Sequence, residues 1–174
     1  MSIRRILLNF IIMILTFTLQ TTVFRVFAFG GVVPNLMLVF VTSIAFIRGD
    51  KVGLLTGFVS GFLVDIFFGA ILGFYALLFM YIGFFVGKLH EVFYSQNMAI
   101  PIAIISVADF IYGFACYVLQ FLLRNEFDIG YYMMNIIIPE MVYTAMVGIF
   151  YYPVVLKIHE RIFDKEQRSE KKFV

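Results

Sequence analysis

The chain has few of the residues from which catalytic and metal centres are built. Its 174 residues include one cysteine, Cys116, and two histidines, His90 and His159. A lone cysteine excludes an internal disulfide and a cysteine-based metal site, and a zinc or haem centre needs more ligands than these. The sequence also lacks a G-x-S-x-G elbow, an H-E-x-x-H helix and a phosphate-binding loop. We therefore expect no enzymatic activity, no metal and no cofactor.

Charged residues are scarce as well. They make up 14% of the chain, whereas 63% of the residues are hydrophobic and the mean hydropathy is +1.00. Soluble domains contain roughly 45–50% apolar and about 25% charged residues, so the composition predicts an integral membrane protein. At about 20 apolar residues per crossing, the chain has room for about five to seven helices and no separate soluble domain. Its intramembrane polar groups are too few to line a hydrophilic pore.

The apolar runs predict an all-α bundle of six transmembrane helices. We expect one domain at residues 1–158 and a charged cytoplasmic tail at 159–174, with spans at 6–24, 32–47, 51–68, 71–87, 98–123 and 136–156. The first run could instead be a signal peptide, because Arg4 and Arg5 precede it, but it is long for one and no A-x-A site precedes Gly30. Pro34 and Pro139 suit the first turns of the second and sixth helices. The second run is short for a full crossing.

The basic residues predict the orientation of the bundle. If both termini are cytoplasmic, 11 of the 13 lysines and arginines lie on the cytoplasmic side, and only Arg25 and Arg124 lie outside. Cytoplasmic loops of membrane proteins carry an excess of Lys and Arg. We therefore expect cytoplasmic N- and C-termini.

Small residues form two stripes along the third and fourth predicted helices. In the third helix, glycines recur every four residues, and in the fourth the small residues alternate by three and four; the glycines of these stripes are Gly53, Gly57, Gly61, Gly73, Gly83 and Gly87. A stripe without side chains lets another helix approach closely. Either the two helices pack on each other as a hairpin, or the stripe is a groove for a helix of another protein. Because so bare a bundle has few other means of acting, we favour the groove. Gly57→Leu or Gly61→Leu should then abolish co-purification with the partner while the protein still inserts.

Three carboxylates fall within or at the ends of the predicted spans, where acids are costly enough to suggest a function. Asp65 and Glu140 fall near the outer ends of their helices, where Arg25 and Arg124 also arrive. We expect these four residues to form an outer polar cluster of structural ion pairs, with catalysis as the alternative.

The third carboxylate, Asp109, is deeper and has no cation at its level. Because burial disfavours the charged form, we expect a protonated Asp109 that is hydrogen-bonded to Gln20, Thr16 or a similar group, with a proton relay as the alternative. Gln20 and Thr16 share one face of the first helix with Asn9.

Several motifs in the first half of the chain resemble a known family. Pro34-Asn35-Leu36 opens a helix, and Arg48-Gly49-Asp50 is followed by G-x-x-x-G-F-x-x-G-x-x-x-D, then by Leu72-Gly73 and Tyr75-Ala76-Leu77. This combination, together with Gln20, the chain length and the basic tail, resembles the rod shape-determining protein MreD family. The resemblance covers essentially the whole chain and is tightest over Pro34–Gly87.

The resemblance implies a non-enzymatic part of the bacterial elongation machinery in the cytoplasmic (inner) membrane. The implied partners are MreC, and indirectly the actin-like MreB, RodA and a class B penicillin-binding transpeptidase, with no nucleic acid. The fold is expected to resemble the six-helix substrate-binding subunits of vitamin ECF transporters, so a small-molecule transporter subunit is the alternative function. Those subunits use an A-x-x-x-A face on the first helix, whereas Ile6–Val23 contains no alanine. We therefore favour a scaffold that docks the single membrane span of MreC against the small-residue stripes.

Overall fold

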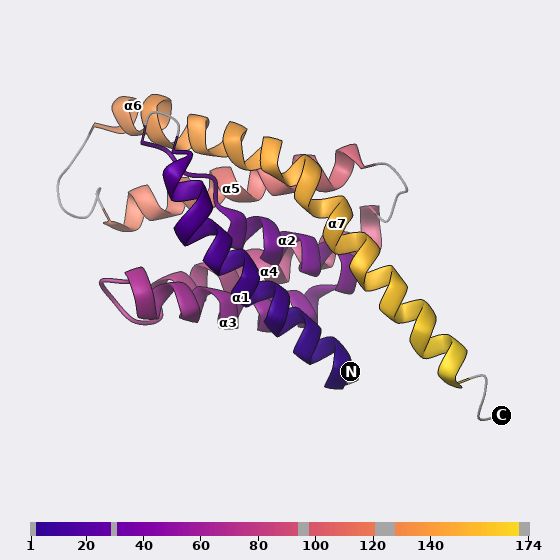
Figure 1. Ribbon diagram of the computed structural model, residues 1–174. Coiled ribbons are helices and arrows are strands. Elements are labelled where there is room, and N and C mark those ends of the chain that lie inside the picture. Colours follow the sequence, from indigo (N-terminus) through magenta and orange to yellow (C-terminus); the bar gives the residue numbers. More distant parts are fainter. Residues whose placement is uncertain (1–2, 29–30, 94–97, 121–127, 171–174) are drawn as a thin grey trace.

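The computed structural model is a nearly all-helical bundle around one short central helix (Figure 1). The structure describes residues 3–28, 31–93, 98–120 and 128–170. The elements in chain order are α1 (Ile3–Val26), α2 (Leu36–Arg48), α3 (Asp50–Phe68), α4 (Phe74–Phe93), α5 (Ala99–Gln120), α6 (Ile129–Tyr132), the π-helical η2 (Met133–Ile137) and α7 (Ile138–Glu170).

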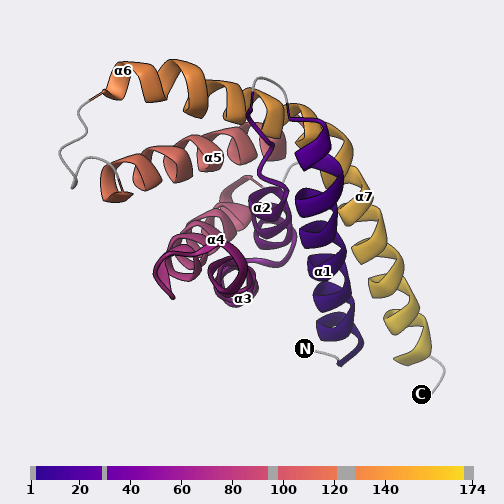
Figure 2. The same ribbon diagram turned by 60° about the vertical axis from the view of Figure 1, so that its left-hand side comes forward.

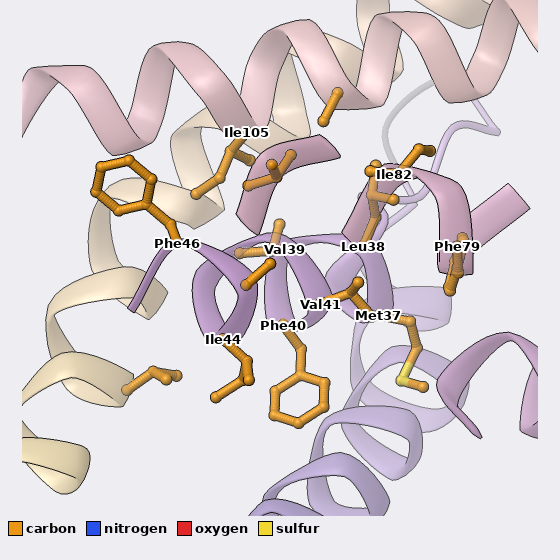
Figure 3. Close-up of a cluster of buried hydrophobic side chains, with 14 of the residues drawn as sticks. Met37, Leu38, Val39, Phe40, Val41, Ile44, Phe46, Phe79, Ile82 and Ile105 are labelled. Atoms are coloured by element: carbon orange, nitrogen blue, oxygen red, sulfur yellow. The ribbon is translucent and has the colours of Figure 1, made fainter. Parts of the chain in front are cut away.

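Helix α2 forms the centre of the core. All of its residues from Leu36 to Phe46 are buried, and α1, α3, α4, α5 and α7 all contact it. Phe40, Ile44 and their neighbours project from α2 in every direction, as the close-up shows (Figure 3). A helix that is apolar all round lies either in lipid or in the core of a protein. With 13 residues α2 is short for a full crossing, and the other helices cover it.

The glycine stripes pack α3 against α4, and this pair of helices makes the most extensive contact among the described elements. A Cβ atom added at Gly53 would fall within 3.0 Å of the backbone of Gly83, and one at Gly57 would do the same at Phe79. A Cβ atom added at Gly61 would clash in the same way with the backbone of Tyr75 and Ala76, and one at Gly87 would clash with the backbone of Asp50. The prediction that this stripe docks a partner helix is therefore wrong, because α4 occupies it. Gly73 lies in the connecting turn instead, at a φ of 96°.

Four helices are long and apolar enough to cross a membrane. These stretches are Arg5–Val26, Asp50–Phe68, Ala99–Leu119 and Ile129–Arg161, while α2 and Phe74–His90 of α4 are shorter apolar helices. The predicted all-α membrane class is confirmed, and the count of six crossings stays a prediction.

Three predicted boundaries differ from the structure by four residues or more. The second helix begins at Leu36 and not at residue 32, α4 ends at Phe93 and not at residue 87, and α7 continues without a break past residue 156 to Glu170. Helix α7 is bent (Figure 2), as expected for a helix with a proline, here Pro153, in its interior.

Candidate functional site

The buried beginning of α2 brings together polar residues from several helices. With 13 residues, α2 is about 20 Å long, and its capping residue Asn35 and its first residue Leu36 are buried inside the bundle. The first N–H groups of any helix have no partner within the helix. Since no water reaches a buried N-terminus, other groups of the protein must accept these hydrogen bonds.

Side chains from three helices or their flanks accept the hydrogen bonds of these N-terminal N–H groups. The Gln20 Oε1 of α1 accepts the Met37 N–H at 2.8 Å, and the Asn35 Oδ1 accepts the Leu38 N–H at 3.1 Å. The Thr144 Oγ1 of α7 accepts the Asn35 N–H, also at 3.1 Å. The polar residues of these lipid-embedded helices thus hold α1 and α7 onto the start of α2.

Asp109 of α5 lies next to this cap. Its side chain is 3% exposed, and neither carboxyl oxygen has a hydrogen bond of normal geometry within the described residues, although the Thr144 hydroxyl approaches it. Of the partners expected for Asp109, which were Gln20, Thr16 or a similar group, the first two bind elsewhere, and the similar group that approaches it is the Thr144 hydroxyl. Gln20 caps α2, whereas the Thr16 hydroxyl donates to the Ile12 carbonyl at 2.7 Å and contacts the Tyr151 hydroxyl.

Glu140 of α7 is the second acid at this site. It is close enough to Asp109 for their charges to interact, and it also acts electrostatically on Tyr112 and Cys116 of α5. In the part of the chain that the structure describes, neither carboxyl has an ion-pair partner. Asp109, which is buried, and Glu140, which is half-buried, therefore influence each other across α5 and α7, although the sequence placed them at different depths and in different roles.

Asp65 has a different role from the predicted ion pair. Its carboxylate, 2% exposed, accepts the backbone N–H groups of Gly73 at 3.0 Å, Tyr75 at 2.9 Å and Ala76 at 3.0 Å. It therefore caps the beginning of α4 from the end of α3, and the predicted cluster with arginine is wrong for this residue. Arg25 is exposed at the end of α1, and Arg124 lies outside the described residues.

Both histidines tie helices together, a role that the sequence did not reveal. The His159 Nε2 of α7 lies 2.8 Å from the Asn9 Oδ1 of α1, and its Nδ1 is hydrogen-bonded to the Val155 carbonyl at 3.0 Å. His90 of α4 is hydrogen-bonded through Nδ1 to the carbonyl of Phe46 near the end of α2. The only available signal was the position of both residues near predicted cytoplasmic helix ends.

The fold and these contacts define a class: a small helical membrane protein whose buried polar groups connect helices. Within the described residues, no group of three or more His, Cys, Asp and Glu side chains could hold a metal ion. The family model of the rod shape-determining protein MreD matches residues 2–162, so the chain belongs to the MreD family. No match was found among curated proteins or among solved structures.

The hydrogen bonds in the structure explain two of the residues that carry the family resemblance. Asn35, of the Pro34-Asn35-Leu36 motif, caps α2, and Asp65, the last residue of the glycine motif, caps α4. The residues that carry the resemblance thus position the two short apolar helices of the bundle. Nothing in the comparisons supports the transporter alternative.

Proposed function

We propose that this protein is a non-enzymatic scaffold of the rod-shape system in the bacterial cytoplasmic membrane, with both termini in the cytoplasm. It docks the membrane span of MreC and thereby connects MreB, RodA and a class B penicillin-binding transpeptidase during cell-wall synthesis. The observation that carries this proposal is the family match over residues 2–162.

The arrangement of the helices supports a scaffold. Side chains of α2 fill the centre of the bundle, and polar caps hold the surrounding helices on it, so the protein offers its partners a preformed outer surface. In a bilayer, apolar helices associate through close packing and polar contacts, because lipid is as apolar as the helices themselves. Since α4 covers the glycine stripe of α3, a partner helix has to dock on an outward face of another helix or of the hairpin as a whole.

Photo-cross-linking in a rod-shaped bacterium tests this proposal. A phenylalanine with a benzophenone side chain replaces one exposed residue on each of four helices: Phe10 on α1, Phe62 on α3, Phe114 on α5 or Phe150 on α7. We expect cross-links to MreC from one face or from two adjacent faces. Phe40 and Phe79, which are buried, are matched control positions that should give none.

Depletion of the protein provides the functional readout. We expect depleted cells to lose their rod shape, and each cross-linking variant that is used should restore it. Absence of MreC cross-links from all four faces in cells of normal shape would contradict direct docking.

A further inference from the structure

Two lysines are brought together at one end of the α3–α4 hairpin. A Cβ atom added at Gly87 of α4 would fall 2.4 Å from the Cα of Asp50 on α3, so the two backbones touch at this level. Lys51 and Lys88 are the next residues in the chain, and both of their side chains are exposed. Backbone contact therefore gathers two cations at one place that a ligand can reach.

Both lysines lie on the side of the hairpin that faces away from α2. The seam between the antiparallel helices runs along Gly57 on α3 and Gly83 on α4. At about 100° per residue, Lys51 is turned about 120° from Gly57, and Lys88 is turned about 140° from Gly83. Because the helices are antiparallel, these two rotations lead to the same side. The opposite side holds the buried Ile82 and is covered by α2, which lies above the hairpin in Figure 2.

The level of the two lysines corresponds to a membrane surface. Helix α3 has 19 residues and is about 28 Å long, which matches a hydrocarbon core of about 30 Å. Lys51, its second residue, therefore lies at the depth where lipid phosphates begin. The basic residues predict this surface to be the cytoplasmic one, whose leaflet carries anionic lipids.

The ammonium group of Lys88 is turned toward the membrane. Its Nζ lies 4.6 Å from the centre of the Phe84 ring, one helical turn deeper. A lysine near the end of a membrane helix ordinarily extends its ammonium group outward to the headgroups and water. Among the described residues neither lysine has an ion-pair partner, and the nearby Asp50 carboxylate accepts the backbone N–H of Lys51 at 2.7 Å. An anion at the depth of the lipid phosphates fits this orientation.

An exposed apolar surface continues from the lysines toward the middle of the membrane. Leu54 and Phe58 follow Lys51 by three and seven residues on α3, and Leu77 precedes Lys88 by eleven residues on α4. These spacings place all three on the side that carries the lysines, and all three are exposed. Cations above an apolar surface match a phosphate headgroup above its acyl chains.

We propose that Lys51 and Lys88 bind the phosphate of an anionic phospholipid, whose acyl chains lie along the exposed side of α3 and α4. Lysine binds phosphate as a point charge. Because neither lysine is paired with a carboxylate among the described residues, the site favours a lipid with a net negative charge over zwitterionic phosphatidylcholine. The inference does not depend on the docking of MreC.

Tryptophan fluorescence tests this inference, because the chain has no tryptophan of its own. Leu54→Trp places a single reporter one turn from Lys51 in the full-length protein, in vesicles of phosphatidylcholine with a minor fraction of phosphatidylglycerol. Each lipid is replaced in turn by its dibrominated form, which quenches tryptophan on contact. We expect phosphatidylglycerol to be enriched at this reporter at least about threefold over its bulk fraction. Phe114→Trp, at an exposed position of α5, is the control reporter and should show no enrichment.

Variants assign the enrichment to the two lysines. In the Leu54→Trp background, Lys51→Gln and Lys88→Gln should each lower it, and the double variant should bring it within about 1.5-fold of the bulk fraction. Lys157→Gln removes an exposed lysine of α7 and should leave the enrichment unchanged. An equal fall in Lys157→Gln would reveal a general effect of surface charge and refute the assigned site.

Two further results would overturn the inference. One is equal quenching by both brominated lipids at Leu54→Trp and at a second reporter, Phe58→Trp, when both lysines are present. This comparison contains no lysine variant, so misfolding of such a variant does not decide it. The other is undiminished enrichment in a folded double variant. Loss of enrichment on addition of inorganic phosphate at constant ionic strength would show that free phosphate occupies the site in place of a lipid.

Discussion

At the scale of single residues, the polar side chains of this apolar chain bind backbone more than they bind one another. Gln20, Asn35 and Thr144 accept N–H groups at the start of α2, and Asp65 accepts three at the start of α4. In a membrane, every backbone N–H group that no helix satisfies must find a protein partner. Short helices that begin inside the bundle therefore require these few polar residues.

Replacement of Asp65 tests the capping role. Asp65→Ala leaves three backbone N–H groups without their acceptor, so we expect the free energy of unfolding to fall by about 2–3 kcal/mol. Asp65→Asn keeps one acceptor oxygen and should cost about 1 kcal/mol, with only mild loss of function. Unfolding by SDS titration in mixed micelles measures both values.

Glu160→Gln, an exposed change, is the control and should stay within about 0.5 kcal/mol of the unchanged protein. Equal losses for Asp65→Asn and Asp65→Ala would show that the charge of Asp65 matters more than its hydrogen bonds.

At the scale of elements, the hairpin of α3 and α4 depends on backbone contact. The backbones of Gly53 and Gly83, and of Gly57 and Phe79, are too close to admit even a Cβ atom between them. Packing of this kind relies on shape, because burial against lipid supplies no hydrophobic gain. The same closeness makes the hairpin intolerant of larger residues.

Gly57→Leu should therefore unfold or mispack the hairpin. We expect a loss above the roughly 1–3 kcal/mol that is typical of an overpacked core, since the clash is with backbone. The amount of protein in the membrane fraction, measured by immunoblot, should fall together with any MreC that co-purifies. Gly130→Leu is the matched control, because a Cβ at Gly130 meets nothing within 4 Å. If Gly57→Leu is present at normal abundance but no longer co-purifies with MreC, the result would support the hypothesis that the glycine stripe docks a partner helix.

At the scale of the whole molecule, the bundle is asymmetric between its two ends. The caps of α2 and α4 lie toward the end that the basic residues predict to be outside, whereas His90 and His159 connect helices at the other end. The proposed scaffold function requires a defined orientation in the membrane, so orientation is the property to measure first.

Accessibility of single cysteines tests that orientation. In a Cys116→Ala background, Asp128→Cys before α6 should react with a membrane-impermeant maleimide in intact spheroplasts. Glu160→Cys near the end of the bundle should react only after permeabilisation, as expected for a cytoplasmic position. Both residues are exposed in the structure, so lack of access within the fold does not explain a failure to react. The reverse pattern of labelling would contradict cytoplasmic termini.

Composition and the motif order were enough to predict the helical membrane class, the approximate helix positions and the MreD family. Those properties add up along the chain: apolar content over about 20 residues decides whether a segment enters lipid, whatever its neighbours are. The glycine spacing also predicted a smooth helix face, because spacing by four depends on local helix geometry alone.

Only the tertiary structure decided which groups meet. The N–H of Asn35 is paired with the hydroxyl of Thr144 across 109 positions of sequence, and the glycines of α3 face α4 and no partner helix. The Asp65 carboxylate accepts backbone N–H groups, and Asp109 of α5 is close enough to Glu140 of α7 to act on it electrostatically. Residue types and spacing state what each side chain can bind, but the choice among acceptors depends on how helices distant in sequence are packed. That choice made Asp65 a cap of α4 and left both Asp109 oxygens without a hydrogen bond of normal geometry among the described residues.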